Sequence, residues 1–226
     1  MTLTDHHSRY LLACEAYSSV KAFDVFSIYE HCFNEYGLPK AIRSDNGVPF
    51  AVSHALHGLS QLSVWWLRLG IKIERIKPGH PEQNGQHERM HRTLKQHLKP
   101  AKANLLQQQE VFDDFQEEFN FERPHEAIDM KTPSEVYCPS EIKLPEQLDE
   151  LEYPLEDSTK KVTKSGDIWL GRNRVYVGRA FRGYNVGYSQ VEDDLYLLKF
   201  MDYELGFFDL ENRRVISHET IFDIKL

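Results

Sequence analysis

Two acidic residues, each close to an Asn-Gly pair, are the side chains best suited to chemistry in this sequence. Asp45 follows the apolar run LPKAI in the stretch RSDNGVPF, and Glu88 follows the second Asn-Gly in PGHPEQNGQHERMHRTLK. Because glycine tolerates positive φ, Asn46-Gly47 predicts a sharp turn that directs Asp45 outward from a strand end. The 42 residues between the two acids leave room for one helix and one strand, which would return the chain to the same sheet edge. Two carboxylates there could share a divalent cation such as Mg²⁺.

The residues after Glu88 carry positive charge at helical spacing. Arg92 and Lys95 stand four and seven positions after Glu88, so they share its face on a helix, and Arg89 and Lys99 extend the charge. A phosphodiester held at the metal would meet these cations. The residues alone leave two other interpretations open, which are an exposed ion pair between Glu88 and Arg92 and a solvated basic face.

The elements that position these residues follow from the spacing of apolar side chains. The patterns predict strands over 1–4, 8–17, 38–45 and 71–79 and helices over 18–36, 53–70, 84–98 and 105–125. A helix cap is expected at Ser18 or Ser19. This order of elements predicts an α/β fold with a mixed sheet and flanking helices.

The composition and the pattern of apolar residues change toward the C-terminus. Residues 139–165 contain three prolines and many acids, which favours an extended connector. From residue 166, short strands separated by turn signals predict a small all-β barrel. The expected domains are therefore a core at 1–138, an acidic linker at 139–165 and a β-barrel at 166–226.

Composition limits the class of protein. The chain has 226 residues, 41% of them hydrophobic, and a net charge of −8. Residues 68–102 carry nine basic and three acidic groups, whereas 103–157 carry three and sixteen. The basic segment can follow phosphates despite the net charge, because distant charges are screened. The acidic segment keeps open a structural or interaction protein without a DNA role.

Cellular location and redox state follow from what the sequence lacks. No apolar run spans a bilayer and no leader sequence is recognisable, so a cytoplasmic location without membrane contact is predicted. Cys14, Cys32 and Cys138 are odd in number and widely spaced, which predicts buried free thiols.

Three stretches in order resemble one known family. RSDNGVPF, IKPGHPEQNGQHERMHRTLK and RPHEAIDMKTPSEVY are similar to the core of insertion-sequence transposases related to retroviral integrases, the DDE recombinases with a ribonuclease-H-like fold. The resemblance covers roughly residues 1–138. It implies that Asp45 and Glu88 are the second and third metal ligands, with Mg²⁺ or Mn²⁺ as cofactor. It also implies 3′-end hydrolysis, strand transfer into target DNA, and a homo-oligomer on paired DNA ends. The spacing between the two ligands is longer than usual, which implies an enlarged region around LSQLSVWW.

The resemblance also implies that one ligand is missing. In the family the first catalytic Asp lies on a strand before a sequence like DxHSRY, and this chain begins inside that sequence, at LTDHHSRYLLAC. Asp5 therefore matches a turn position, and the first ligand is expected before Met1. His6 and His7 are adjacent and point in different directions, so a turn role is predicted for them also. Two expectations follow. One is a truncated transposase with weakly bound cations and exposed strand edges. The alternative is a catalytically dead remnant that binds DNA or a partner.

Overall fold

The computed structural model describes residues 1–17, 22–45, 47, 49–51, 58–76, 80–98, 104–155 and 157–216. The chain divides into two compact units, the first formed by Met1–Pro39 and Ile76–Leu144 and the second by Lys40–Arg75 and Pro145–Leu226. Helices and strands alternate in the first half and strands dominate the second, so the predicted α/β class is confirmed. None of the helices in the described ranges is long and apolar enough to cross a membrane.

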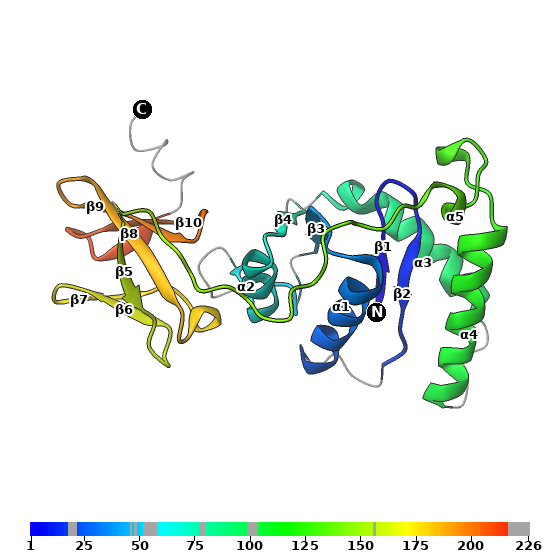
Figure 1. Cartoon of the computed structure of the whole chain (residues 1–226), viewed down its shortest axis with the longest axis horizontal. Helices are drawn as coiled ribbons and strands as arrows, with labels where there is room; N and C mark the ends of the chain where they lie inside the picture. Colours follow the sequence, from blue (N-terminus) through cyan, green and yellow to red (C-terminus); the bar gives the residue numbers. More distant parts are fainter. Residues whose placement is uncertain are drawn as a thin grey trace. The chain divides into compact units, whose positions relative to one another are not determined.

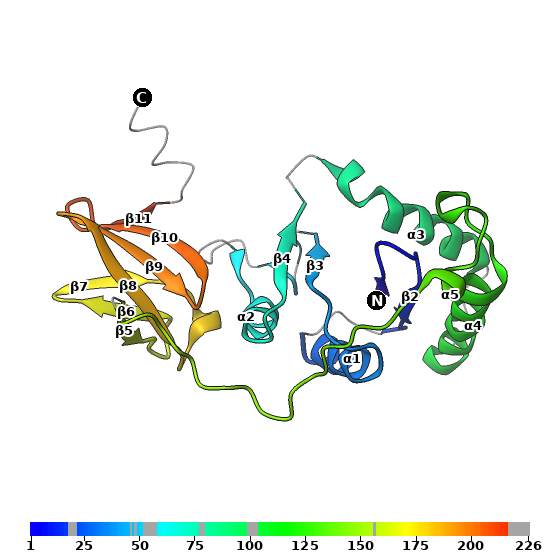
Figure 2. The ribbon, with the colours of Figure 1, turned by 45° about the horizontal axis from the view of Figure 1, so that its top comes forward.

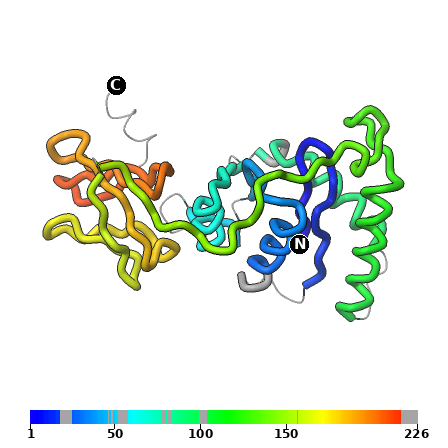
Figure 3. Tube along the Cα trace, in the orientation of Figure 1, coloured from blue at the N-terminus to red at the C-terminus, as the bar shows by residue number. Residues whose placement is uncertain are grey.

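The first unit combines a two-stranded sheet with helices. Its strands are β1 (Thr2–Thr4) and β2 (Leu11–Cys14), which pair antiparallel across a turn that Figure 3 shows in dark blue. Its longer helices are α1 (Ala22–Tyr36), α3 (Gly85–His97) and α4 (Leu105–Glu117). The shorter helical elements are the 3₁₀ turns Pro81–Asn84 and Glu126–Ile128, the π-helical turn Glu118–Glu122, and α5 (Pro133–Val136).

Helices cover both faces of the β1–β2 sheet (Figures 1 and 2). Leu3 and Ala13 pack with Ile28 and Cys32 of α1. On the other face, Leu11 and Cys14 join a core of α3 and α4 residues, which are Met90, Leu94, Phe115 and Phe119. Leu11 and Cys14 share a face although they are three positions apart, because the register shifts between Leu3 and Thr4. In α1 the side chains of Ile28, Tyr29, Cys32 and Phe33 are buried.

Side-chain amides from α4 and the π-helical turn cover the outer edge of β2. Asn120 accepts from the Leu11 N–H at 2.8 Å and donates to the Leu11 carbonyl at 3.0 Å. Gln116 donates to the same carbonyl at 2.9 Å. Gln109 donates to the Cys14 carbonyl at 3.0 Å and accepts from the Ala16 N–H at 2.9 Å. These amides bond to the backbone of β2 where a further strand would otherwise pair. The outer edge of β2 therefore differs from an unprotected strand edge, whose backbone groups are unpaired.

The second unit contains a β-α-β segment. Strands β3 (Ala41–Ser44) and β4 (Lys72–Arg75) pair in parallel, and α2 (Gln61–Arg68) connects them. A mixed sheet contains both parallel and antiparallel strand pairs. Both kinds of pair are present, but in two separate two-stranded sheets, since β3–β4 is parallel and β1–β2 is antiparallel. Helix α2 begins at Gln61, because Ser60 caps it by accepting from the Ser63 N–H at 3.2 Å. Residues 53–57 of the predicted helix 53–70 lie outside the described residues.

The rest of the second unit is all-β. A five-stranded antiparallel sheet has the order β11-β10-β9-β8-β5, beside the β6–β7 hairpin (Figure 2). The strands are β5 (Ser158–Lys161), β6 (Asp167–Leu170), β7 (Asn173–Tyr176), β8 (Asn185–Glu192), β9 (Leu195–Phe200), β10 (Tyr203–Asp209) and β11 (Arg214–Ile216), with a 3₁₀ turn at Arg179–Phe181. Their core includes Ile168, Phe181 and Phe200, and Leu59 and Val64 belong to the same apolar cluster.

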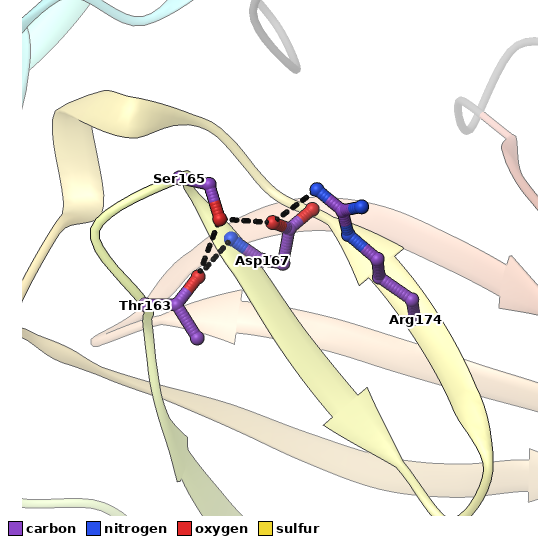
Figure 4. Close-up of polar contacts among 4 residues, drawn as sticks. All are labelled: Thr163, Ser165, Asp167 and Arg174. Carbon is purple, nitrogen blue, oxygen red and sulfur yellow. Dashed lines mark hydrogen bonds and ion pairs between the residues drawn. The ribbon is translucent and has the colours of Figure 1, made fainter.

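A polar network closes the β6–β7 hairpin (Figure 4). Arg174 donates to Asp167 Oδ2 at 2.8 Å, and Ser165 Oγ donates to the same oxygen at 2.6 Å. Thr163 Oγ1 accepts from the Asp167 N–H at 3.1 Å. The hydrogen bond from Arg174 is the main cause that lowers the pKa of Asp167. Residues close in sequence therefore fix the base of this hairpin.

Some sequence expectations need correction. The exposed side chain of Cys138 contradicts the prediction of three buried thiols, whereas Cys14 and Cys32 are buried and burial raises the pKa of each to about 12. Residues 158–161 lie in the expected linker yet form β5 by pairing with β8. The cap at Ser18 or Ser19 lies outside the described residues. The division into 1–138, 139–165 and 166–226 stays a prediction.

Candidate functional site

Asp45 lies directly after β3, as the sequence predicted, and its side chain is exposed. Its Oδ1 accepts from the Gly47 N–H at 2.9 Å, and this hydrogen bond orients the carboxylate and stabilises the turn. Gly47 does not adopt positive φ, which corrects the expected reason for this glycine. A Cβ at position 47 would lie 3.1 Å from Asp45 Oδ1. A side chain at position 47 would therefore require the Asp45 carboxylate to shift by a few tenths of an ångström.

Arg75, at the end of β4, bonds to two carbonyls that follow Asp45 in the sequence. Its Nη2 donates to the carbonyls of Phe50 at 3.4 Å and Gly58 at 3.1 Å. Burial is the main cause that lowers the pKa of Arg75. No sequence pattern indicates this role, since Arg75 stands in a strand that alternates apolar and charged residues.

Glu88 lies in the first turn of α3, and its side chain is exposed. Met90 and Leu94 are buried in the core and fix which side of the helix faces solvent. A carboxylate near a helix N-terminus is stabilised by the helix dipole. The predicted helical placement of Glu88 is therefore confirmed.

The predicted cations lie on the solvent side of α3. The side chains of Arg89, Arg92 and Lys95 are exposed, and the last two share the face of Glu88 at i+4 and i+7. An ion pair between Glu88 and Arg92 is not among those of the described residues. Lys99 lies outside the described residues. Three of the four predicted DNA-binding residues therefore form one basic helix surface.

The turn between β1 and β2 adds a cation that the sequence analysis did not single out. Arg9 has a φ of 69° and contacts Gln86 of α3 through its guanidinium. Burial is the main cause that lowers the pKa of Arg9, and the nearby charge of Arg89 lowers it further. Arg9 therefore lies close enough to the start of α3 to extend its positive surface.

Asp5 has the turn role that the sequence predicted. Its Oδ2 accepts from the Ser8 N–H at 2.7 Å and from Ser8 Oγ at 2.6 Å. The side chains of His6 and His7 are exposed in the same turn. The Asp5 carboxylate therefore stabilises the turn between β1 and β2.

The type and exposure of the Asp45 and Glu88 side chains bear on whether they can bind a metal ion. Within the described ranges, no group of three or more His, Cys, Asp or Glu side chains lies together in a way that could hold a metal ion. Asp45 belongs to the second compact unit and Glu88 to the first. Each is an exposed carboxylate, the oxygen donor that Mg²⁺ prefers, so the chemistry of the donors suits the ion.

Part of the chain is similar to known proteins. Residues 69–133 match the model of the family described as integrase core domain. A stretch of 71 residues is 42% identical to the Gag-Pol polyprotein of baboon endogenous virus (strain M7), and 71 residues are 42% identical to the Pol polyprotein of feline endogenous virus ECE1. These stretches are 31% of this chain but only 4% and 6% of the two polyproteins. The chain therefore spans a small part of these relatives.

A solved intasome of simian T-cell lymphotropic virus, in complex with the PP2A regulatory subunit B56 gamma, resembles this chain at 16% identity with a TM-score of 0.47. The alignment covers 96% of this chain and 72% of that one. The family match confirms the predicted resemblance to the cores of DDE integrases and transposases, which as a class use divalent metals. Its residues include Glu88, Arg89, Arg92 and Lys95, whereas Asp45 precedes them.

Proposed function

We propose, from the integrase-core match of residues 69–133, that this chain acts on DNA as part of a DDE transposase. The reaction is metal-dependent hydrolysis of a phosphodiester followed by strand transfer into target DNA. The observation that supports this most directly is the arrangement on α3, where Glu88 shares one exposed face with Arg92 and Lys95 within the matched residues.

The roles of the residues follow from their chemistry. Asp45 and Glu88 are the ligands of Mg²⁺ or Mn²⁺, which would activate the attacking oxygen and stabilise the leaving one when bound. The exposed cations Arg89, Arg92 and Lys95 hold the phosphate backbone beside Glu88, and Lys99 continues them in the sequence. The partners are the ends of a mobile element and the target DNA, and paired ends call for a homo-oligomer.

A second candidate function is DNA binding without catalysis. The exposed face of Arg89, Arg92 and Lys95 supports it, because phosphate binding needs these cations and not the carboxylates. The two candidates differ in what Glu88 does. In the first it is essential, and in the second its removal leaves DNA affinity intact.

The test combines DNA binding and DNA cleavage by the whole chain. Binding to linear duplex DNA, followed by fluorescence anisotropy over a salt series, should weaken with salt, and Lys95→Ala should reduce the slope by about one phosphate contact. Lys131→Ala, on a different segment, serves as the control and should leave the slope unchanged. Mn²⁺-dependent nicking of supercoiled plasmid should disappear in Glu88→Gln and persist in Glu110→Gln.

The possible outcomes separate the candidates. Nicking that survives in Glu88→Gln would contradict the metal assignment. Salt-sensitive binding without nicking by the chain would favour the second candidate. If the chain does not bind DNA even at low salt, both candidates are wrong and the acidic interaction protein is the better hypothesis.

A further inference from the structure

Three polar atoms from β1 and α3 converge on one point in the first unit. The two Nε2 atoms of His87 and His91 lie 3.1 Å apart, and Thr2 Oγ1 lies 3.1 Å from the first and 2.8 Å from the second. The two imidazole rings have centroids 4.6 Å apart and an interplanar angle of 57°. The three atoms thus form a nearly equilateral triangle of possible ligands.

Thr4 favours the tautomer of His87 that a metal would need. Its Oγ1 lies 3.2 Å from His87 Nδ1. When Thr4 accepts this hydrogen bond, the proton is on Nδ1 and the lone pair of Nε2 faces the triangle. Metal-binding histidines commonly donate their other ring N–H in this way, which fixes the ring orientation.

The same three atoms can be linked in two ways. With the His87 proton on Nδ1, the Thr2 hydroxyl can donate to His87 Nε2 and accept from His91 Nε2–H. When His91 also carries its proton on Nδ1, both Nε2 lone pairs are available to a cation bound between the two rings.

The environment of His91 favours a neutral ring. Burial is the main cause that lowers its pKa, with smaller contributions from the charges of Lys95 and the N-terminus. A neutral imidazole is the form that binds metals.

The spacing of the nitrogens suits a transition metal. Two nitrogens each about 2.0–2.1 Å from a tetrahedral Zn²⁺ are about 3.3 Å apart, close to the observed separation of the two Nε2 atoms. Imidazole pairs select zinc, copper or nickel, whereas Mg²⁺ prefers oxygen ligands.

We propose that His87 and His91 bind a divalent transition metal of the Zn²⁺ class, with the Thr2 hydroxyl beside it and water at the remaining positions. The ligands come from two turns of α3, and Thr2 comes from β1, so the ion joins this strand to the helix. Glu88 faces solvent from the same helix, and this site is therefore distinct from the carboxylates of the proposed DNA chemistry.

The experiment uses Co²⁺ and Zn²⁺ with the intact chain. Titration with Co²⁺ should produce visible d–d absorption bands that Zn²⁺ displaces, and histidine Hε1 resonances of two residues should shift together in the NMR spectrum. His87→Gln and His91→Gln should each weaken Zn²⁺ binding at least about tenfold, and the double substitution should abolish it. His7→Gln removes a nearby exposed histidine and should change nothing.

Two results would overturn the proposal. One is wild-type chain whose histidine resonances do not respond to Zn²⁺, a measurement that requires no variant to fold. The other is Zn²⁺ affinity that is the same in the double variant as in the wild type. Glu88→Gln should retain the cobalt spectrum, so failure of the proposed DNA chemistry and failure of the histidine site give different results.

Discussion

Two antiparallel pairs of short strands, β1–β2 and β6–β7, are held in different ways. Leu11 of β2 bonds to Asn120, which lies 109 positions away in the sequence. Asp167 of β6 bonds to Arg174 and Ser165, which lie seven and two positions away. An isolated two-stranded sheet is marginal in water, so each pair needs such support. The first depends on a helix folded elsewhere in its unit, whereas the second carries its polar support within the hairpin.

This difference matters for the candidate functional site. Glu88 and the basic face of α3 belong to the unit whose sheet depends on distant helices. Met90 and Leu94 of α3 share one core with Leu11 and Cys14 of β2. Loss of the amide contacts at β2 should therefore disturb the packing that sets the direction of α3.

The largest predicted effect is that of Asn120→Ala. Asn120 is 1% exposed, and its removal leaves the buried Leu11 N–H without its partner and creates a cavity. We expect a loss of about 2–4 kcal/mol in the free energy of unfolding. The measurement is urea unfolding followed by far-ultraviolet circular dichroism, which reports mainly the longer helices α1, α3 and α4 of the first unit.

A second variant, Gln116→Ala, and a second probe, tryptophan fluorescence, serve as controls for this test. Gln116→Ala removes one hydrogen bond from a carbonyl that Asn120 still serves, so about 0.5–1 kcal/mol should be lost. All three tryptophans, Trp65, Trp66 and Trp169, belong to the second unit, so tryptophan fluorescence reports that unit alone. An equal shift of the fluorescence transition in Asn120→Ala would contradict the view that the amides act within their own unit.

A smaller effect is expected from Asp167→Asn in the β6–β7 hairpin. The Asp167 side chain is 4% exposed, but that of Arg174 is 61% exposed, so solvent screens the ion pair. We expect a loss of about 1 kcal/mol, observed in the fluorescence transition and reduced by salt.

The pH dependence of that loss has a definite sign. The folded-state pKa of Asp167 lies below its ordinary value of 3.8, mainly because Arg174 donates to it. Its charge therefore stabilises the fold above the ordinary pKa and ceases to do so as the pH falls through the folded-state value. The stability difference between wild type and Asp167→Asn should be constant near neutral pH and shrink below about pH 4. A difference that grows on acidification would mean that the ion pair has been misassigned.

The sequence predicted what depends on local pattern. The order of strands and helices, the turn at Asp5, and the first-turn position of Glu88 follow from periodicity, Asn-Gly pairs and family motifs. The Asn-Gly pair predicts a turn at Gly47 with positive φ, whereas the structure has no positive φ there and brings the Gly47 backbone close to the Asp45 carboxylate. Such a distance depends on the folded loop and has no sequence pattern.

Contacts between distant segments escaped the sequence analysis. The run QQQ at 107–109 is consistent with an exposed polar helix, and nothing in it reveals that Gln109 pairs with the backbone of β2. His87 and His91 stand four positions apart, but their meeting with Thr2 requires the packing of β1 on α3. A single sequence fixes which residues share a helix face, and tertiary packing decides what that face meets.

The smallest predicted effect is that of Thr163→Val, which tests whether the β6–β7 network is cooperative. Thr163 Oγ1 accepts from the Asp167 N–H at 3.1 Å and contacts Ser165 Oγ at 3.1 Å, and Val keeps the shape of Thr while removing both contacts. One neutral, partly solvated hydrogen bond contributes about 0.5 kcal/mol, and the exposed Thr159→Val in β5 provides a control near zero. In the double variant with Asp167→Asn, a loss smaller than the sum would show that Thr163 acts by positioning Asp167 for Arg174. Simple additivity would instead mean that the ion pair and the turn stabilise this hairpin independently, which would make it more modular than the β1–β2 pair.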